Sequence, residues 1–295
     1  MSLFIQSLVN GLNQGAIYAL IALGYTMVYG IIRMINFAHG DFIMVGSYTL
    51  FYTIPLMISH GMPAWLAVVA AVAVCVAVGV LVEQIAYKPV RKAGSMSALI
   101  TALAVSVFLE NLAMVLFGAN PKSVTAIFSL PSIRFLGAKI QVKYLLTLGI
   151  GLLMMVGLQL FVKKTRLGKA MRAVPQDKEA STLVGINVNR IITTTFAIGS
   201  GLAAVAALMY CSTYPRCTTD MGSMMGLKAF IAAVLGGIGI IPGAMLGGLL
   251  VGLIEIFVKV YIAPGWYEAI TYAILIVVLL VKPAGILGKN VGEKV

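Results

Sequence analysis

Residues 1–32, MSLFIQSLVNGLNQGAIYALIALGYTMVYGII, contain no Asp, Glu, Lys or Arg. A helix needs about 20 residues to cross the ~30 Å hydrocarbon core of a bilayer, so this run is long enough to span it. Further runs without these four residue types follow at 42–82, 144–162, 191–215 and 229–254. The sequence therefore predicts an integral membrane protein with several spans.

The composition excludes a soluble protein. Hydrophobic residues make up 61% of the 295 residues and charged residues only 10%, whereas soluble domains average about 45–50% apolar and about 25% charged residues. We interpret the net charge of +12 as the cytoplasmic excess of Lys and Arg that orients membrane proteins, and not as a nucleic-acid-binding surface. The N-terminus lacks the basic region of a cleaved signal peptide, so 6–30 is predicted to remain as the first span.

Three basic segments set the predicted topology, namely 88–92, 163–190 and the tail from Lys282. Placing all three in the cytoplasm satisfies the positive-inside tendency, fixes the parity of spans between them and puts the N-terminus outside. We expect an all-α polytopic fold, a single transmembrane domain over 1–295 with eight or nine spans. The expected spans are 6–32, 41–59, 63–86, 96–117, 143–162, 191–213, 227–240, 243–262 and 266–281. Segment 227–240 is short for a crossing at ~1.5 Å per residue, so we expect it to be half-inserted.

Two segments interrupt the helical pattern, Gly30–Asp41 in the first half and Gly236–Gly243 in the second. Backbone groups freed by such breaks must be buried in protein or line a wet cavity, and paired breaks in the two halves point to a transport site. The polar residues of the first break either line the cytoplasmic mouth of the path or form a solvated cytoplasmic turn. The candidate path residues are Asn36, His39, Gly40, Asp41, Gly236, Gly237 and Gly239.

Segment 163–190 is the only long, charge-dense polar stretch, and it joins two spans. Pro175 suits the first position of a helix and Gly185 the position just after its end, which predicts a helix of about ten residues. Asp177 and Glu179 would then lie in its first turn, where acids complement the helix dipole. This segment is called the connector below.

The rest of the connector suggests a surface for another protein. Ala180, Leu183 and Val184 share one face of the predicted helix, and Asn187 can cap the span that follows. A small apolar face on a helix with charged ends favours docking of a cytoplasmic partner. The alternative is an ordinary positive-inside loop that lies on anionic headgroups.

Some polar residues inside the spans have structural explanations. Glu110 is expected to bond a neighbouring helix or a partner subunit, and Glu255 can neutralise Lys259 four residues later. The GxxxG spacings at 11–15, 243–247 and 248–252 predict close helix packing. The three cysteines show no metal-ligand spacing and are interpreted as free thiols; a bridge between Cys211 and Cys217 is possible but has no support.

The chain lacks the motif that a nucleotide-hydrolysing subunit needs. The sequence contains no G-x-x-x-x-G-K-[ST], and Gly168-Lys169 is followed by Ala170, so ATP hydrolysis on this chain is not expected. Gly199-Ser200-Gly201 resembles part of a protease nucleophile site, which would need a histidine near the serine. The two histidines, His39 and His60, lie in other parts of the chain. We therefore expect no catalytic residues on this chain.

Several blocks of the sequence resemble one known family. MRAVPQDKEASTLVGINVNR in the connector resembles the cytoplasmic coupling loop of ABC-importer permeases of the branched-chain amino acid family. Residues 10–41, 83–91, 228–248 and 282–289 resemble the LivH-type subunit in the same order. The resemblance covers most of the chain, and the INFAHG and AAVLGGIG blocks are its most specific parts.

The resemblance implies a passive permease subunit of a bacterial inner-membrane importer, working by alternating access. It implies a second permease subunit, LivM-like or a second copy, two cytoplasmic ABC ATPases and a periplasmic or lipid-anchored amino acid binding protein. ATP and Mg²⁺ would bind the ATPases, and this chain would hold no cofactor or metal. The coupling contacts that it implies are Arg172, Gln176, Asp177, Glu179, Ala180, Leu183 and Gly185.

Two other functions stay open at this point. One is a permease of the same family that carries urea or a short amide. The other is an ion-coupled secondary transporter that works alone, with a proton or sodium relay on Asp41 or Glu110. Few acidic residues are available for such a relay, which favours the ATP-driven importer.

Overall fold

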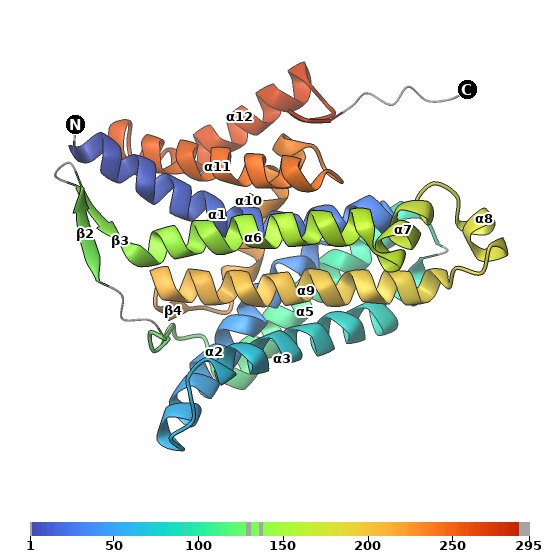
Figure 1. Cartoon of the computed structure of the whole chain (residues 1–295), viewed down its shortest axis with the longest axis horizontal. Helices are drawn as coiled ribbons and strands as arrows, with labels where there is room; N and C mark the ends of the chain where they lie inside the picture. Colours follow the sequence, from blue (N-terminus) through green and yellow to red (C-terminus); the bar gives the residue numbers. More distant parts are fainter. Residues whose placement is uncertain (1, 92, 128–130, 136–137, 289–295) are drawn as a thin grey trace.

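The computed structural model describes residues 2–91, 93–127, 131–135 and 138–288. Lys92 and the part of the basic tail beyond residue 288 belong to the predicted cytoplasmic segments and lie outside the described residues. The molecule is a helical bundle with two short pairs of strands (Figure 1). The all-α polytopic fold predicted from the sequence is thus confirmed.

The long helices run roughly along one axis of the molecule (Figure 1). Their bounds in chain order are α1 (Ser2–Ile32), α2 (Asp41–Ser59), α3 (Leu66–Val82), α5 (Ser95–Phe117), α6 (Val142–Lys164), α9 (Val188–Thr213), α10 (Met221–Gly236), α11 (Ile241–Tyr261) and α12 (Tyr267–Val281). The short helical elements are η1 (Phe37–His39), η2 (Glu83–Tyr87), α4 (Lys88–Val90), α7 (Arg166–Ala173) and α8 (Lys178–Leu183).

Seven helical stretches of the described residues are long and apolar enough to cross a membrane. Two shorter apolar helices, α10 and α12, accompany them. Two long helices, α5 and α6, separate the first basic segment from the connector, and four apolar helices separate the connector from Lys282, as predicted. Helix α10 begins six residues earlier than the predicted half-inserted segment and ends at Gly236. The total of eight or nine complete spans stays a prediction.

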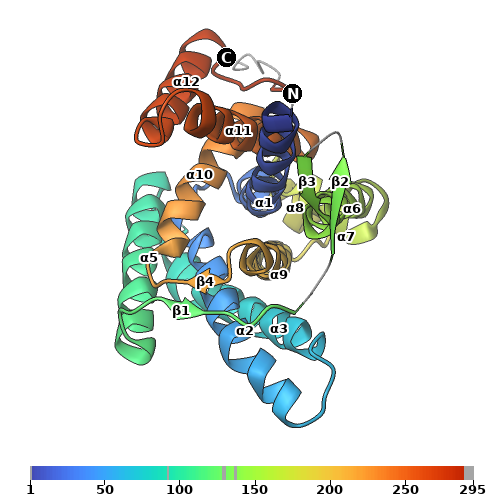
Figure 2. The ribbon, with the colours of Figure 1, turned by 90° about the vertical axis from the view of Figure 1, so that its left-hand side faces the viewer.

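The strands and the connector occupy opposite ends of the bundle (Figure 1). Strand β1 (Lys122–Ser123) pairs with β4 (Arg216–Cys217), and β2 (Ser132–Phe135) pairs with β3 (Ala138–Gln141), both antiparallel. The N-terminus lies at the strand end, and α7 and α8 lie at the other (Figures 1 and 2). This arrangement agrees with the predicted parity, so we call the strand end outer and the connector end inner.

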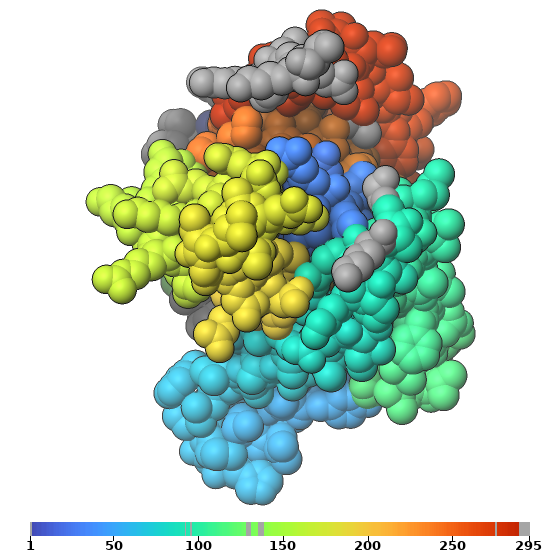
Figure 3. All heavy atoms as spheres, turned by 90° about the vertical axis from the view of Figure 1, so that its right-hand side faces the viewer, coloured from blue at the N-terminus to red at the C-terminus, as the bar shows by residue number. Residues whose placement is uncertain are grey.

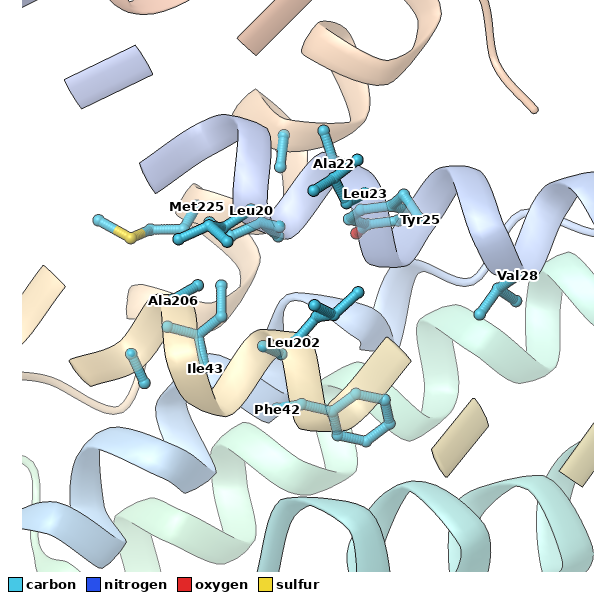
Figure 4. Packing of buried hydrophobic residues seen from close by; sticks show 14 of the residues in the cluster. Leu20, Ala22, Leu23, Tyr25, Val28, Phe42, Ile43, Leu202, Ala206 and Met225 are labelled. Atoms are coloured by element: carbon cyan, nitrogen blue, oxygen red, sulfur yellow. The ribbon is translucent and has the colours of Figure 1, made fainter. Parts of the chain in front are cut away.

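Helix α1 forms the centre of the bundle and packs against α6, α9, α10 and α11. Its apolar residues surround the whole helix, and the core around it includes Leu20, Leu23, Phe42, Leu202 and Met225 from four helices (Figure 4). A helix that is apolar on all sides must be covered by protein or lipid everywhere. By contrast, α5 and α6 lie at the edge and leave most of their apolar side chains exposed or only partly buried.

The predicted close packing of glycine motifs occurs between α1 and α11. A Cβ atom on Gly15 would lie 2.6 Å from the Cα of Leu249, and one on Gly248 would lie 2.5 Å from the Cα of Ala19. Small residues at such crossings let two backbones touch in lipid. The GxxxG pairs at 11–15 and 248–252 therefore face each other within this chain.

Candidate functional site

The first break turns back into the bundle. Helix α1 ends at Ile32, Arg33 adopts a left-handed conformation (φ 57°), and the chain has no regular structure until η1. The ring of His39 then packs against α1 and α9, because a Cβ atom on Gly24 would overlap it and one on Gly199 would lie 3.3 Å from its Cε1. Gly24 lies about two turns before the end of α1. Helix α2 therefore begins inside the bundle.

This geometry corrects one of the two expectations for the first break. Asn36, His39 and Asp41 expose 2%, 1% and 0% of their surface, so the solvated cytoplasmic turn is wrong. The physical reason is that Gly24 and Gly199 leave space for the His39 ring between two helices. The expectation that these residues line a transport path stays a prediction.

Most buried side-chain polar atoms of this segment have no hydrogen-bond partner among the described residues. The Tyr87 hydroxyl donates to Asn36 Oδ1 at 2.5 Å. Asn36 Nδ2, both ring nitrogens of His39 and both carboxylate oxygens of Asp41 are unpaired. Because buried polar groups are normally paired, the unpaired atoms around Asp41 mark this place as a functional candidate.

Helix α10 meets α2 at this same place. A Cβ atom on Gly40 would lie 2.6 Å from the Cα of Gly226, and one on Gly222 would lie 2.7 Å from the Cα of Asp41. Both helices begin here, α2 at Asp41 and α10 at Met221. The positive ends of two helix dipoles therefore converge beside the Asp41 carboxylate. We call this place the α2–α10 junction.

Helix α5, which carries Ser106 and Glu110, packs against η1 and α2 next to the junction. Glu110 Oε1 is buried and has no hydrogen-bond partner among the described residues. The expected bond from Glu110 to a neighbouring helix is therefore not made by this oxygen, and a bond to a partner subunit stays a prediction. Neither Asp41 nor Glu110 is paired with a basic side chain in the hydrogen bonds or ion pairs of the described chain.

The second break lies at the inner end of the bundle. Helix α10 ends at Gly236, and Gly237 and Gly239 adopt positive φ angles of 107° and 91° that favour glycine. Gly239 meets the first break at Gly30, where an added Cβ atom would lie 3.4 Å from the Gly239 Cα. The two breaks thus touch, but the length of α10 separates Gly236, Gly237 and Gly239 from the junction.

The connector forms two short helices. Asp177 begins α8, because its Oδ1 accepts hydrogen bonds from the backbone N–H groups of Glu179 and Ala180 at 2.9 Å. The predicted start at Pro175 is therefore wrong, and α8 has six residues instead of about ten. A capping carboxylate with an extended backbone sets the start of the helix. Gly185 ends it with a positive φ of 85°, as predicted.

Two other features of the connector concern its ends. Asn187 Oδ1 accepts a hydrogen bond from the Arg190 N–H at 3.0 Å, which confirms its predicted role as the cap of the next span. Helix α7 was not predicted separately; Thr165 caps it by accepting a bond from Gly168 N–H at 2.9 Å. That Thr165 cap followed by an amphipathic octapeptide was its signal in the sequence.

The apolar face of α8 is exposed. Leu183 and Val184 expose 89% and 76% of their surface, and Ala180 is also exposed. Behind this face, the segment from Val174 to Glu179 borders a crevice of about 370 Å³ together with Arg33 at the end of α1. The space-filling view from this end shows the connector projecting beside the end of α1 (Figure 3). A partner that binds α8 therefore lies next to the first break.

A second group of charges is buried between α1, α10, α11 and α12. Glu255 accepts hydrogen bonds from Tyr18 at 2.6 Å, from Lys259 at 2.6 Å and from Lys228 at 3.2 Å. Glu268 lies 3.6 Å from Lys228. The predicted Glu255–Lys259 pair is confirmed, and we call the whole group the Glu255 cluster. Lys228 was missed, although a single lysine in a long apolar stretch is itself a signal of a buried partner.

The three cysteines are free and buried. The possible bridge between Cys211 and Cys217 is therefore absent from the structure, and the interpretation as free thiols is confirmed. Burial raises the pKa of the Cys217 thiol, in the outer strand β4, to about 11.

An apolar bundle with two broken helices, a buried unpaired acid and a projecting charged connector defines a multi-pass membrane transport protein. The family model described as "Branched-chain amino acid transport system / permease component" matches residues 7–279. The chain belongs to this family, as the sequence predicted, and it is a permease subunit of the importer class.

Full-length relatives support this assignment. The chain is 43% identical to the high-affinity branched-chain amino acid transport system permease protein BraD of Pseudomonas aeruginosa, over 99% of this chain and 98% of the relative. It is 41% identical to the permease proteins LivH of Salmonella typhimurium and of Escherichia coli, with the same two coverages. No solved structure matches the chain.

Proposed function

We propose that this chain is the translocation subunit of an ATP-driven importer for branched-chain amino acids. The names of the relatives support the substrate class. The exposed apolar face of α8 is the observation that carries the proposed mode of action, because Leu183 and Val184 are left in water at the inner end of a membrane protein. Contiguous exposed apolar side chains outside the membrane mark a protein-binding surface.

The proposal assigns the driving force to other subunits. The chain contains no phosphate-binding G-x-x-x-x-G-K-[ST] motif, so two cytoplasmic ATPases hold the ATP and Mg²⁺, and this chain holds no cofactor. A second permease subunit, LivM-like or a second copy, and a periplasmic or lipid-anchored binding protein complete the importer. All of 1–295 works as one transmembrane domain that carries the connector on its inner side.

The proposed coupling contacts lie on or beside the connector helices. The α8 contacts are Asp177, Glu179, Ala180, Leu183 and Gly185, and Arg172 of α7 and Gln176 of the turn lie beside them. Asp177 acts by holding α8 in its helical conformation. The connector and Arg33 at the end of α1 border the same crevice, so a movement of the connector changes the space beside the end of α1.

The proposed translocation path runs from the α2–α10 junction to the contact between the two breaks. Asn36, His39, Gly40 and Asp41 supply its buried polar part. Gly236, Gly237 and Gly239 supply its inner end, where backbone and not side chains form the wall. Glycines at the inner end let α10 move against the end of α1 without side-chain collisions.

The experiment compares Leu183→Asp with Ile133→Asp in the complete importer in proteoliposomes. Ile133 is an exposed apolar residue of β2 at the outer end, with 53% of its surface exposed, so it controls for the chemistry of the change. We expect Leu183→Asp to abolish ATP-driven leucine uptake or pull-down of the ATPases by the permease, while Ile133→Asp keeps both. Uptake at the wild-type rate by Leu183→Asp would overturn the coupling.

Two measurements decide against the other functions. Leucine uptake by the purified chain without ATPases would identify a secondary transporter that uses Asp41 or Glu110. Competition of uptake by urea and not by leucine would identify an amide permease. We expect no leucine uptake without the ATPases, and we expect leucine and not urea to compete for uptake.

A further inference from the structure

A cavity lies directly on the outer side of the α2–α10 junction. It has a volume of about 260 Å³ and is bounded by α2, α3 and α5. Most of its lining side chains are apolar, among them Met44, Val45, Val78, Leu109 and Ala113. Cavities of roughly 300 Å³ with apolar walls and a few convergent polar groups are typical ligand sites.

The acids of the junction and the cavity share the same helix faces. On α2, Asp41 lies three and four residues before Met44 and Val45, which places it on the face that lines the cavity. On α5, Glu110 lies three residues before Ala113. Asp41 and Glu110 do not line the cavity themselves; each lies about one helical turn from a lining residue, on the inner side of it.

An aromatic pair lies at the outer end of the cavity, which is open at the surface of the bundle beside Tyr52 and Leu116. Tyr48 and Phe117 both line the cavity, and their rings stack with centroids 4.6 Å apart. The Tyr48 side chain is buried, with 2% of its surface exposed, and its hydroxyl has no hydrogen-bond partner among the described residues. The space between α2 and α5 thus has an acidic inner end, apolar walls and an aromatic outer end.

Neither acid is paired with a basic side chain, whereas the buried Glu255 is bonded to two lysines. Asp41 is completely buried with both oxygens unpaired, and Glu110 Oε1 is unpaired as well. Lys228, on the neighbouring helix α10, is already bonded to Glu255. A buried carboxylate without a counter-ion is costly, so the arrangement suits a ligand that brings a cation.

We propose that this cavity is the membrane binding site for the transported amino acid. The ammonium group of the ligand binds Asp41 and Glu110, and its branched side chain fills the cavity up to Tyr48. The N-terminus of α10 meets Asp41 at the same junction and presents its positive dipole end to the ligand carboxylate. The site rests on the proposed function and adds the residues that recognise each part of the substrate.

The first experiment measures binding of radiolabelled leucine to the complex of permease subunits and ATPases, without the binding protein. The competitors are 3-methylbutylamine, which keeps the ammonium and the branched chain, and 4-methylpentanoate, which lacks the ammonium. We expect the amine to displace half of the bound leucine at a concentration at least about tenfold lower than the acid needs. A tenfold difference in affinity corresponds to one charge-assisted contact. Equal or better competition by the acid would overturn the ammonium site.

The second experiment separates the two ends of the site. Ala113→Leu fills the cavity, and Val107→Leu is its control, because Val107 lies on the outward face of α5 with 57% of its surface exposed. We expect Ala113→Leu to lower leucine binding by about tenfold, since a small apolar wall residue is exchanged for a larger one. Asp41→Asn is expected to remove the preference for the amine. Unchanged binding and preference in both variants would overturn the proposal.

Failure of this site and failure of the proposed function give different results. If both variants, Ala113→Leu and Asp41→Asn, take up leucine at the rate of the wild-type importer, the proposed site is wrong and the proposed function stands. If the wild-type importer takes up no branched-chain amino acid, the proposed function itself is wrong. Retained assembly of each variant with the ATPases, measured by pull-down, excludes misfolding as the cause of a loss.

Discussion

Two of the acids buried in the described part of the bundle, Glu255 and Asp41, differ in whether they are paired. Glu255 accepts hydrogen bonds from one tyrosine and two lysines, whereas Asp41 has no partner for either oxygen among the described residues. Both are almost completely inaccessible to solvent. The Glu255 cluster is complete without a ligand and joins four helices, while the α2–α10 junction is incomplete. Pairing therefore separates the structural acid from the functional one.

The largest effect is expected from breaking the complete cluster. Glu255→Gln leaves Lys228 buried, with 7% of its side chain exposed and only Glu268 nearby at 3.6 Å. Removing one partner of a buried ion pair costs about 3–5 kcal/mol. We expect a large fall in the thermal unfolding temperature of the purified protein in detergent. The control is Glu268→Gln, because Glu268 is 40% exposed; an equal fall in both variants would contradict the structural role of Glu255.

Replacing both charges sharpens the same comparison. In the double variant Lys228→Met with Glu255→Gln, no buried lysine is left without its carboxylate, and the remaining polar groups are Tyr18 and the half-exposed Lys259. Because the double variant leaves no unpaired buried lysine, we expect at least about 2 kcal/mol of the loss to return. Thermal unfolding measures it. A double variant less stable than Glu255→Gln alone would show that Lys228 acts independently of Glu255.

The sequence predicted the paired acid better than the unpaired one. The spacing of Glu255 and Lys259 predicts contact, because residues four apart on a helix are neighbours. The contacts of Asp41 with α10 and α5 join residues far apart in the chain, and no local pattern shows them. The all-α fold and the caps at Gly185 and Asn187 follow from local patterns, and these were predicted correctly; the number of complete spans stays a prediction.

The errors have a common physical origin. Helix α8 begins at Asp177 and not at Pro175 as predicted, because the Asp177 carboxylate accepts hydrogen bonds from two backbone N–H groups. The polar first break was compatible with a solvated turn until the space beside Gly24 was known. Charge and hydropathy rules place a polar segment near water; whether it turns back into the bundle depends on the packing of helices that are distant in sequence.

The unpaired acid is expected to respond oppositely to the paired one. Asp41→Asn removes a buried charge that has no partner, so the folded protein loses no ion pair. We expect the unfolding temperature in detergent to stay the same or rise, while ATP-driven leucine uptake falls by about tenfold or more. Asp220→Asn is the control, because Asp220 is an exposed acid at the start of α10. A loss of stability as large as that of Glu255→Gln would assign Asp41 a structural role.

The smallest effect is expected at Asn36 Oδ1, a buried side-chain atom of the first break that has a hydrogen-bond partner. Tyr87→Phe removes the hydroxyl that donates to Asn36 Oδ1 at 2.5 Å, and it leaves both ends of that buried amide without a partner. Leaving one buried acceptor unpaired costs about 1–3 kcal/mol. We expect a modest fall in the unfolding temperature, smaller than for Glu255→Gln, with leucine uptake reduced less than in Asp41→Asn. The control is Tyr29→Phe, at a tyrosine of α1 with no hydrogen bond from its hydroxyl among the described residues. If Tyr87→Phe abolished uptake without changing stability, Asn36 would belong with Asp41 to the unpaired, ligand-dependent group, and the boundary between structural and functional polar residues would move into the first break itself.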